Sequence, residues 1–177
     1  MSGLGSALRN VLVRGVVAVV EAGRKMQAIQ LRLTAGEVKG DVEHFEPYGW
    51  TSHPHPGAEA AIAFIGGDRS HGVVLCVADR RYRHVGLEAG EVAIYTDEGD
   101  SVVLKRGRVV EITTETFRLN AQRCEMNAAE GIFLNSDLVS VSNDIRAEGD
   151  VVAGGKSLRD HRHKDVQPGS GTSGGPV

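Results

Sequence analysis

Bulky aromatic residues are scarce in this sequence, which contains one Trp, three Tyr and four Phe in 177 residues. A conventional globular β domain uses aromatic side chains as large core anchors, yet only Phe117 and Phe133 follow Tyr95. Cysteine is scarce too, and Cys76 and Cys124 form no CxxC motif. We therefore expect no disulfide framework, two thiols that act as small apolar core residues, and synthesis in a reducing cytoplasm.

Membrane-spanning, nucleic-acid-binding and nucleotide-binding patterns are also lacking. The apolar stretch VLVRGVVAVV is interrupted by Arg14 and is shorter than the about 20 residues that cross a bilayer. It does not fit a signal peptide either, so we expect a soluble, unprocessed chain. The net charge is -3 with no dominant basic block, which argues against a general nucleic-acid partner. No GxxxxGK[ST] loop is present, so no nucleotide site is expected.

The first half of the chain contains period-two patterns that predict β-hairpins. Val17 and Val19 alternate with their neighbours, and Ile29, Leu31 and Leu33 repeat the pattern after the turn AGRK. A second hairpin is predicted for EAAIAFIGGDRSHGVVLCVAD, around its Gly-Asp turn, and the intervening VEHFEPYGWTSHPHPG is interpreted as a loop. Several short strands in this length of chain favour a small β-barrel of the OB type.

From about residue 85 onwards, short alternating segments are separated by Gly, Asn and Asp. Their apolar residues are small or medium in size and are interleaved with Thr, Ser and Asn, so each strand buries little surface by itself. Three chains wound around one axis would each contribute an apolar stripe to a shared core. We therefore predict an intertwined homotrimer, a β-prism or triple-stranded β-helix. A monomeric β-solenoid or meander is the alternative, although no exact internal repeat supports it.

Near the C-terminal end, His161 and His163 are separated by one residue. On an extended strand both imidazoles point to the same side, and imidazole suits Zn, Fe, Ni, Co and Cu. Three interpretations are open: an exposed pair without a ligand, the start of an HxHxD hydrolytic site with Asp165, or a cage of six imidazoles from three chains. A closed cage leaves no position for substrate or activated water, so its metal would lock the chain ends together.

The hydrolytic interpretation lacks ligands. HxHxD resembles the first part of the metallo-β-lactamase signature, but Val166 stands where that signature has a histidine. The missing ligands would have to come from the distant histidines, which are His44, His53, His55, His71 and His84. A proline follows both His53 and His55, which favours polyproline geometry and a loop over a second metal site.

One long stretch, DVEHFEPYGWTSHPHPGAEAAIAFIGGDRSHGVVLCVADRRYRHVGLEAGEVAIYTDEGD, resembles the Mu-type phage baseplate central spike family, also known as baseplate assembly protein V. Its most specific parts are PYGWTSHPHPGAEA and GGDRSHGVV. The likeness extends through the β-rich region to the HxH pair, so it covers most of the chain.

The resemblance implies a homotrimeric spike at the tip of a contractile phage tail, a structural protein and not an enzyme. It implies an OB-type barrel that binds the baseplate hub, a triple-stranded β-helical shaft, and an apex that holds one Fe ion per trimer through six histidines. His161 and His163 fall on that iron-binding motif. Calcium (Ca2+) and chloride (Cl-) ions in the shaft are also implied, with no ligands assigned. The implied partners are the other copies, the hub protein and the host outer membrane, which the spike pierces during tail contraction and genome delivery; no specific nucleic acid and no small-molecule substrate are expected.

We therefore predict an all-β chain with an N-terminal arm at 1–10, an OB-type barrel at 11–88, a β-helical shaft at 89–155 and a metal-binding apex at 156–177. The protein would be assembled in the host cytoplasm and located in the virion, at the tip of the tail baseplate. Two other functions stay open: a metal-dependent hydrolase that uses the HxHxD cluster, and the spike of a headless contractile bacteriocin particle, which would be built identically. A glycan-binding fibre would need exposed aromatic residues on the shaft, where they are scarce.

Overall fold

The computed structural model describes residues 11–33, 36–162 and 169. Within these residues the regular structure is β-strand apart from the short 3₁₀ turn η2 (Ile65–Gly67), which confirms the predicted all-β class. No helix in the described part of the chain is long and apolar enough to cross a membrane. The chain divides into two compact units, Met1–Asn120 and Ala121–Val177.

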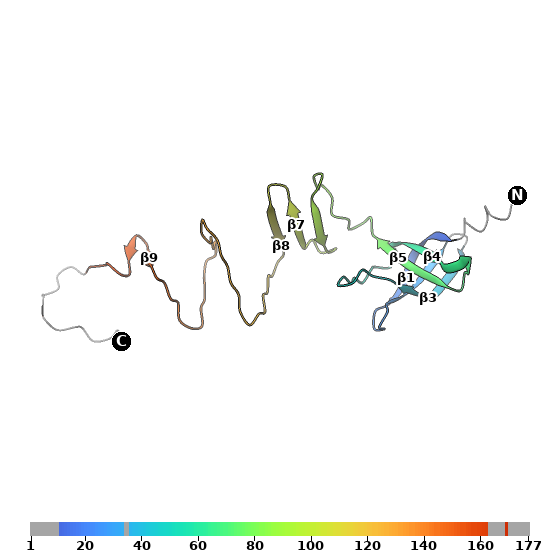
Figure 1. Cartoon of the computed structure of the whole chain (residues 1–177), viewed down its shortest axis with the longest axis horizontal. Helices are drawn as coiled ribbons and strands as arrows, with labels where there is room; N and C mark the ends of the chain where they lie inside the picture. The colour runs from blue at the N-terminus through green and yellow to red at the C-terminus, as the bar shows by residue number, and fades with distance from the viewer. Residues whose placement is uncertain (1–10, 34–35, 163–168, 170–177) are drawn as a thin grey trace. The chain divides into compact units, whose positions relative to one another are not determined.

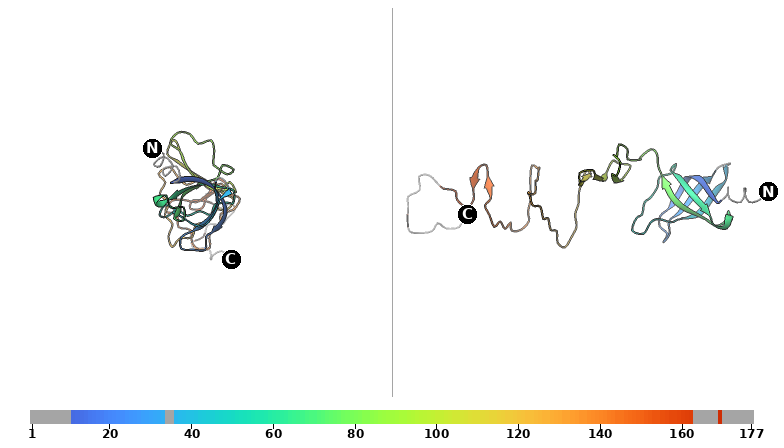
Figure 2. Two further views of the ribbon diagram at one scale, coloured as in Figure 1. Left: turned by 90° about the vertical axis from the view of Figure 1, so that its right-hand side faces the viewer. Right: turned by 45° about the horizontal axis from the view of Figure 1, so that its top comes forward.

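Five strands of the first unit close into a barrel (Figures 1 and 2). They are β1 (Leu12–Glu21), β2 (Ala28–Leu33), β3 (Val38–His44), β4 (Glu59–Phe64) and β5 (Gly72–Ala78). Their order around the barrel is β1-β2-β3-β5-β4, and β4 pairs with β1 to close it. Both predicted hairpins are confirmed, because β1 with β2 and β4 with β5 are antiparallel pairs. Five is the strand number of an OB-type barrel, and the assignment to that fold stays a prediction.

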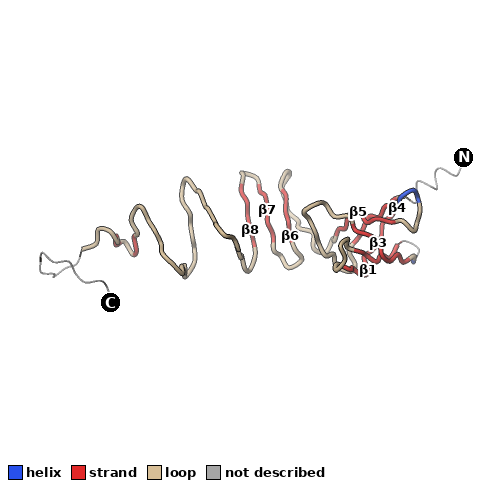
Figure 3. The backbone as a smooth tube through the Cα atoms, turned by 60° about the horizontal axis from the view of Figure 1, so that its bottom comes forward, coloured by secondary structure: helices blue, strands red, loops and turns tan. Residues whose placement is uncertain are grey.

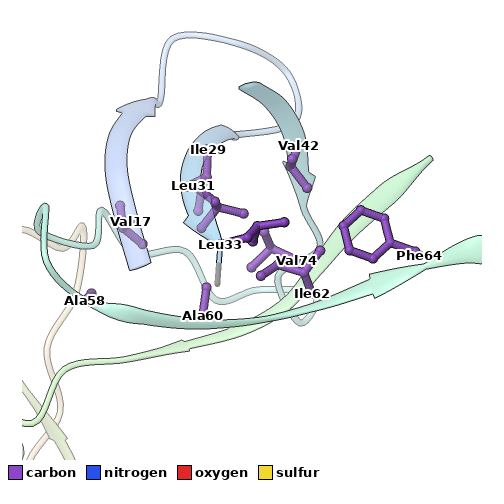
Figure 4. Close-up of a cluster of buried hydrophobic side chains, with 10 residues drawn as sticks. All are labelled: Val17, Ile29, Leu31, Leu33, Val42, Ala58, Ala60, Ile62, Phe64 and Val74. Carbon is purple, nitrogen blue, oxygen red and sulfur yellow. The ribbon is translucent and has the colours of Figure 1, made fainter. Parts of the chain in front are cut away.

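Alternate residues of these strands fill the barrel, as their period-two patterns predict (Figure 4). The largest fully buried side chains are Phe64, Ile29, Leu31, Ile62, Val17 and Val74. The expected loop began too early, because residues 42–44 belong to β3 and Val42 lies in the core. The end of β3 is held by parallel pairing with β5, in which Glu43 lies opposite Val73. This partner is distant in sequence, so the local pattern did not reveal it.

The expectation that Cys76 packs in the barrel core is wrong, since Cys76 is exposed, and Cys124 is exposed in the single chain as well. In β5 the register against β4 shifts between Val74 and Cys76, where Ile62 and Ala61 are the opposing residues. Such a bulge turns the following side chain to the other face of the strand. Val74 therefore points into the core and Cys76 points out.

The barrel has an end where the chain enters and an end where it leaves. At the entry end, β1 begins, β4 ends and β5 begins, because Leu12 pairs with Ala63 and Phe64 pairs with Gly72. At the exit end, Glu59 pairs with Ala78, so the loop before β4 lies beside the point where the chain leaves β5. The loop that joins β3 to β4, residues 45–58, therefore lies at the exit end.

Beyond the barrel, β6 (Val92–Tyr95), β7 (Ser101–Lys105) and β8 (Val109–Thr113) form an antiparallel sheet in chain order. In the described part of the second unit there is one small hairpin, β9 (Val152–Ala153) with β10 (Lys156–Ser157). The predicted series of short strands between these elements is not seen, and residues 114–151 are drawn as loop in Figure 3. A strand is defined by hydrogen bonds to a neighbour, and among the described residues this extended segment pairs with no strand.

Candidate functional site

One face of the sheet β6–β8 consists entirely of aliphatic side chains. The register places Val92 opposite Leu104, Ile94 opposite Val102, and Val102 opposite Ile112. Directly opposite residues share a face, so the members of this open face are Val92, Ile94, Val102, Leu104, Val110 and Ile112. All of them except Val102 are at least half exposed. Exposed apolar surfaces of this kind are typical of sites that contact another molecule.

The opposite face of the same sheet is mixed and partly covered. Val103 is only 3% exposed, whereas Lys105 and Glu111 form an ion pair of 2.8 Å on this face. The ring of His84, from the segment before β6, lies 5.9 Å from the ring of Tyr95. Within the described residues, this face is therefore partly covered, and the aliphatic face is open.

Residues 114–151 continue the pattern of exposed apolar residues. Sharp bends recur at residues 115, 122, 129–130, 137, 142–143 and 148–149. Between successive bends lie pairs of apolar residues two positions apart, which are Phe117 and Leu119, Cys124 and Met126, Ile132 and Leu134, and Val139 and Val141. In an extended backbone the members of a pair project to the same side. All of these side chains are exposed in the single chain.

The small hairpin β9–β10 is organised by the carboxylate of Asp150. One oxygen of Asp150 accepts hydrogen bonds from the backbone N–H groups of Val151 at 2.8 Å and Arg159 at 3.1 Å. The backbone N–H of Leu158 donates to the carbonyl of Val151 at 2.8 Å. A hydrogen bond from Ser157, followed by the backbone bonds, lowers the pKa of Asp150. The carboxylate thus holds the start of the hairpin against the turn that follows it.

The ring of His161 is oriented by a contact with this turn. Its Nδ1 lies 2.9 Å from the carbonyl oxygen of Leu158, and because a carbonyl only accepts, Nδ1 donates its proton. Metal-ligating histidines commonly make this contact, which sets the tautomer and orients the ring. His163 and Asp165, the other residues of the predicted cluster, lie outside the described residues. Among the residues that the structure does describe, no group of three or more His, Cys, Asp and Glu could hold a metal.

Two other histidines, His44 and His55, make contacts within the first unit. His44 is buried, and its Nδ1 donates to the side-chain oxygen of Gln27 at 3.2 Å. Burial lowers the pKa of His44, so the neutral ring is favoured. The Nε2 of His55 donates to Asp97 at 3.0 Å, and its ring lies 5.2 Å from that of Tyr82. These contacts were not predicted, because Asp97 is remote from His55 in the sequence and neither residue belongs to a recognisable motif.

Comparison with known proteins places this chain among phage proteins. Residues 14–81 match the family described as "Bacteriophage Mu Gp45, N-terminal", and residues 157–177 match the "GpV Apex motif", which includes both His161 and His163. Baseplate puncturing device gp45 of Escherichia phage Mu is 37% identical over 154 residues, which are 86% of this chain and 74% of that protein. Mu-like prophage FluMu protein gp45 of Haemophilus influenzae is 34% identical over 170 residues, which are 92% and 91% of the two chains.

These matches confirm the likeness that PYGWTSHPHPGAEA and GGDRSHGVV indicated, since both segments lie within residues 14–81. The identities extend over most of the chain and over most of each relative. The chain therefore belongs to the phage Mu gp45 family, the family of baseplate puncturing device gp45.

Proposed function

We propose that this protein is the central spike of a contractile phage tail baseplate, a homotrimer that pierces the host outer membrane when the tail contracts. The name of the phage Mu relative, baseplate puncturing device, supports the place in the virion and the structural role. Energy comes from contraction of the tail, so the spike acts by its shape and stiffness, not as an enzyme. The barrel docks on the hub protein of the baseplate, and the C-terminal apex is the end that enters the host membrane first.

The observation that carries the trimer is the open aliphatic face of the sheet β6–β8. Six aliphatic side chains per chain lie there, and five of them are at least half exposed to water. Burial of a Val, Leu or Ile side chain contributes about 1.5–3 kcal/mol, so leaving this face uncovered is costly. Three such faces around a threefold axis cover one another completely. The apolar pairs between the bends of residues 114–151 continue the same core along the axis, as a triple-stranded β-helix requires.

An assembly of this kind also explains why residues 114–151 are extended without strands. In the trimer, their backbone N–H and C=O groups form hydrogen bonds with strands of the two neighbouring chains. In an isolated extended segment these groups would bond only to water. Each chain then winds around the others, and the shaft resists unravelling under load.

A metal ion at the apex would join the three chain ends. Three copies of His161 and His163 supply six imidazoles, which together bind one iron ion per trimer. Imidazole is a ligand that iron accepts. The contact of His161 supports this, since its Nδ1 lies 2.9 Å from the carbonyl oxygen of Leu158 and a hydrogen bond of this kind orients metal-ligating histidines. The apex match at residues 157–177 spans both histidines. Calcium and chloride ions in the shaft belong to the same proposal, without assigned ligands.

The test measures the molecular mass and the metal content of the same sample. Size-exclusion chromatography with light scattering, followed by elemental analysis of the peak, is applied to the wild type and to the double variant His161→Ala/His163→Ala. We expect a trimer with one iron per three chains, and a variant that stays trimeric but loses the iron. A monomer with one metal per chain would contradict the spike and favour a hydrolase. A trimer without metal would keep the shaft and exclude the proposed apex.

A further inference from the structure

An exposed aromatic loop lies at the exit end of the barrel. Phe45, Tyr48 and Trp50 lie within the loop of residues 45–58 and are 51%, 105% and 58% exposed. Trp50 is the only tryptophan of the chain, and aromatic residues are scarce everywhere else. Tryptophan and tyrosine are the residues most enriched where interfaces contribute strongly to binding. We call residues 45–58 the aromatic loop.

Hydrogen bonds hold the aromatic loop in one conformation. The two carboxylate oxygens of Glu46 accept from the backbone N–H of Ser52 at 2.6 Å and from the hydroxyl of Thr51 at 3.0 Å. The N–H of Trp50 donates to the carbonyl of Pro47 at 3.0 Å, and Gly49, with φ of +83°, occupies the third position of this turn. A turn of this kind needs positive φ there, which glycine adopts without strain. The aromatic side chains are therefore presented by a fixed backbone and lose little entropy on binding.

The loop is also tied to the barrel beneath it. Gln27 accepts a hydrogen bond from His44 and donates to the carbonyl oxygen of Ser52 at 2.9 Å, which links the loop to buried structure. Trp50 lines a pocket of about 250 Å³ together with Leu75, Cys76 and Val77 of β5. The pocket is also lined by the polar residues His44, Glu46, Thr51 and Ser52, so it offers both apolar and polar contacts to a partner.

The position of the loop indicates which partner it meets. Its C-terminal arm contacts the chain that leads into the sheet β6–β8, because Arg81 donates to the carbonyl of Pro56 at 3.0 Å and His55 donates to Asp97 at 3.0 Å. Asp97 follows β6, whose Val92 and Ile94 belong to the open aliphatic face. The aromatic loop is thus connected to the sheet that needs other copies of the chain.

We propose that the aromatic loop of each protomer packs against the neighbouring protomer and forms a collar of contacts where the barrels join the shaft. This inference rests on the proposed trimer. A second copy is favoured over the hub protein because the loop lies at the exit end of the barrel and is bonded to the sheet that bears the open aliphatic face. In a closed ring each copy uses its loop on the next, so three identical contacts result.

Trp50 itself reports the contact. Its fluorescence emission and its quenching by acrylamide are measured on the purified wild-type protein, in the peak whose mass is determined by light scattering, before and after addition of the hub protein. We expect a trimer whose Trp50 emission is blue-shifted and whose quenching constant is several-fold lower than in the urea-unfolded chain, with no further change when the hub protein is added.

Two variants test the energy of the contact. Tyr48→Ser changes a side chain that is fully exposed in the protomer, so the protomer should fold normally while the trimer dissociates at a lower urea concentration. The control is Ile65→Ser at the entry end, where Ile65 is 53% exposed, and it should leave the dissociation midpoint unchanged. Equal midpoints for Tyr48→Ser and the wild type would overturn the inference.

The outcomes separate this inference from the trimer on which it rests. A trimer in which Trp50 stays fully quenchable overturns the collar and leaves the spike intact. A trimer in which Trp50 becomes shielded only when the hub protein binds also overturns it, because the loop then serves the hub. A monomeric peak overturns both proposals.

Discussion

Val109 and Val110 are neighbours on β8 that project from opposite faces of the sheet. Val110 pairs with Leu104 on the open aliphatic face, and Val109 pairs with Lys105 on the face that the chain partly covers. In the single chain, Val110 is 62% exposed and Val109 is 49% exposed. The same substitution, Val→Ser, can therefore be made at two adjacent positions that differ mainly in the face they occupy.

The trimer predicts different consequences for the two variants. Full burial of a valine contributes about 1.5 kcal/mol at the low end, and most of the Val110 surface remains to be covered on assembly, so Val110→Ser should remove about 1 kcal/mol per protomer. Three protomers lose about 3 kcal/mol together, which corresponds to roughly a hundredfold change in the equilibrium between the trimer and its monomers. Burial of the serine hydroxyl adds to this loss if the core provides no partner for it. Val109→Ser should leave the trimer almost unchanged.

The assay is the urea dependence of the trimer mass, followed by light scattering at several protein concentrations. Val110→Ser should dissociate at clearly lower urea than the wild type, and Val109→Ser should follow the wild type. If both variants shift equally, or if neither does, the open aliphatic face is not the core of the assembly. A larger effect of Val109→Ser would show that the opposite face is buried between chains.

Two further predictions concern the barrel and the apex. Gly15→Ala should lower the stability of the barrel by about 1–3 kcal/mol by overpacking, because the new Cβ would lie 2.8 Å from a Leu33 methyl group. At the control position, the Cβ of Gly23→Ala meets nothing within 4 Å, so this variant should be near neutral. Thermal unfolding followed by circular dichroism measures both variants. The pKa of Asp150 is lowered in the folded protein, so its contribution to the hairpin β9–β10 is present above the ordinary value of 3.8 and is lost as the pH falls through the lowered value. The amide NMR signals of the hairpin should therefore shift together at acidic pH, and Asp150→Asn should abolish that transition; an unchanged transition in the variant would assign it to another group.

Much of the barrel could be predicted because its information is local. The alternation of Ile29, Leu31 and Leu33 predicts a strand with one buried face, and the structure places all three in the core. The bulge in β5 could not be predicted, because it depends on how Cys76 and Val74 register against β4. A shift of one residue reverses the face of each side chain, and no local pattern records it.

In the candidate functional site, too, the local features could be predicted from the sequence and the pairing of distant segments could not. The spacing of His161 and His163 is a local feature, so the sequence alone identified the candidate ligands. The aliphatic pattern of β6, β7 and β8 was visible as well, but the doublets Val102–Val103 and Val109–Val110 left open which member faces which side. Only the pairing of the strands decides this, by placing Val102 and Val110 with Ile94 and Leu104.

The sequence by itself determined the β class, the two barrel hairpins, the family and the shortage of large core residues beyond Tyr95. The tertiary structure decided which aliphatic face stays open, that Cys76 points outward, and that the aromatic loop is braced to the start of the sheet by His55 and Asp97. Periodicity and composition depend on neighbours along the chain, which the sequence contains. Faces, registers and long-range contacts depend on which distant segments pair, and that choice is made by the packing of the whole chain.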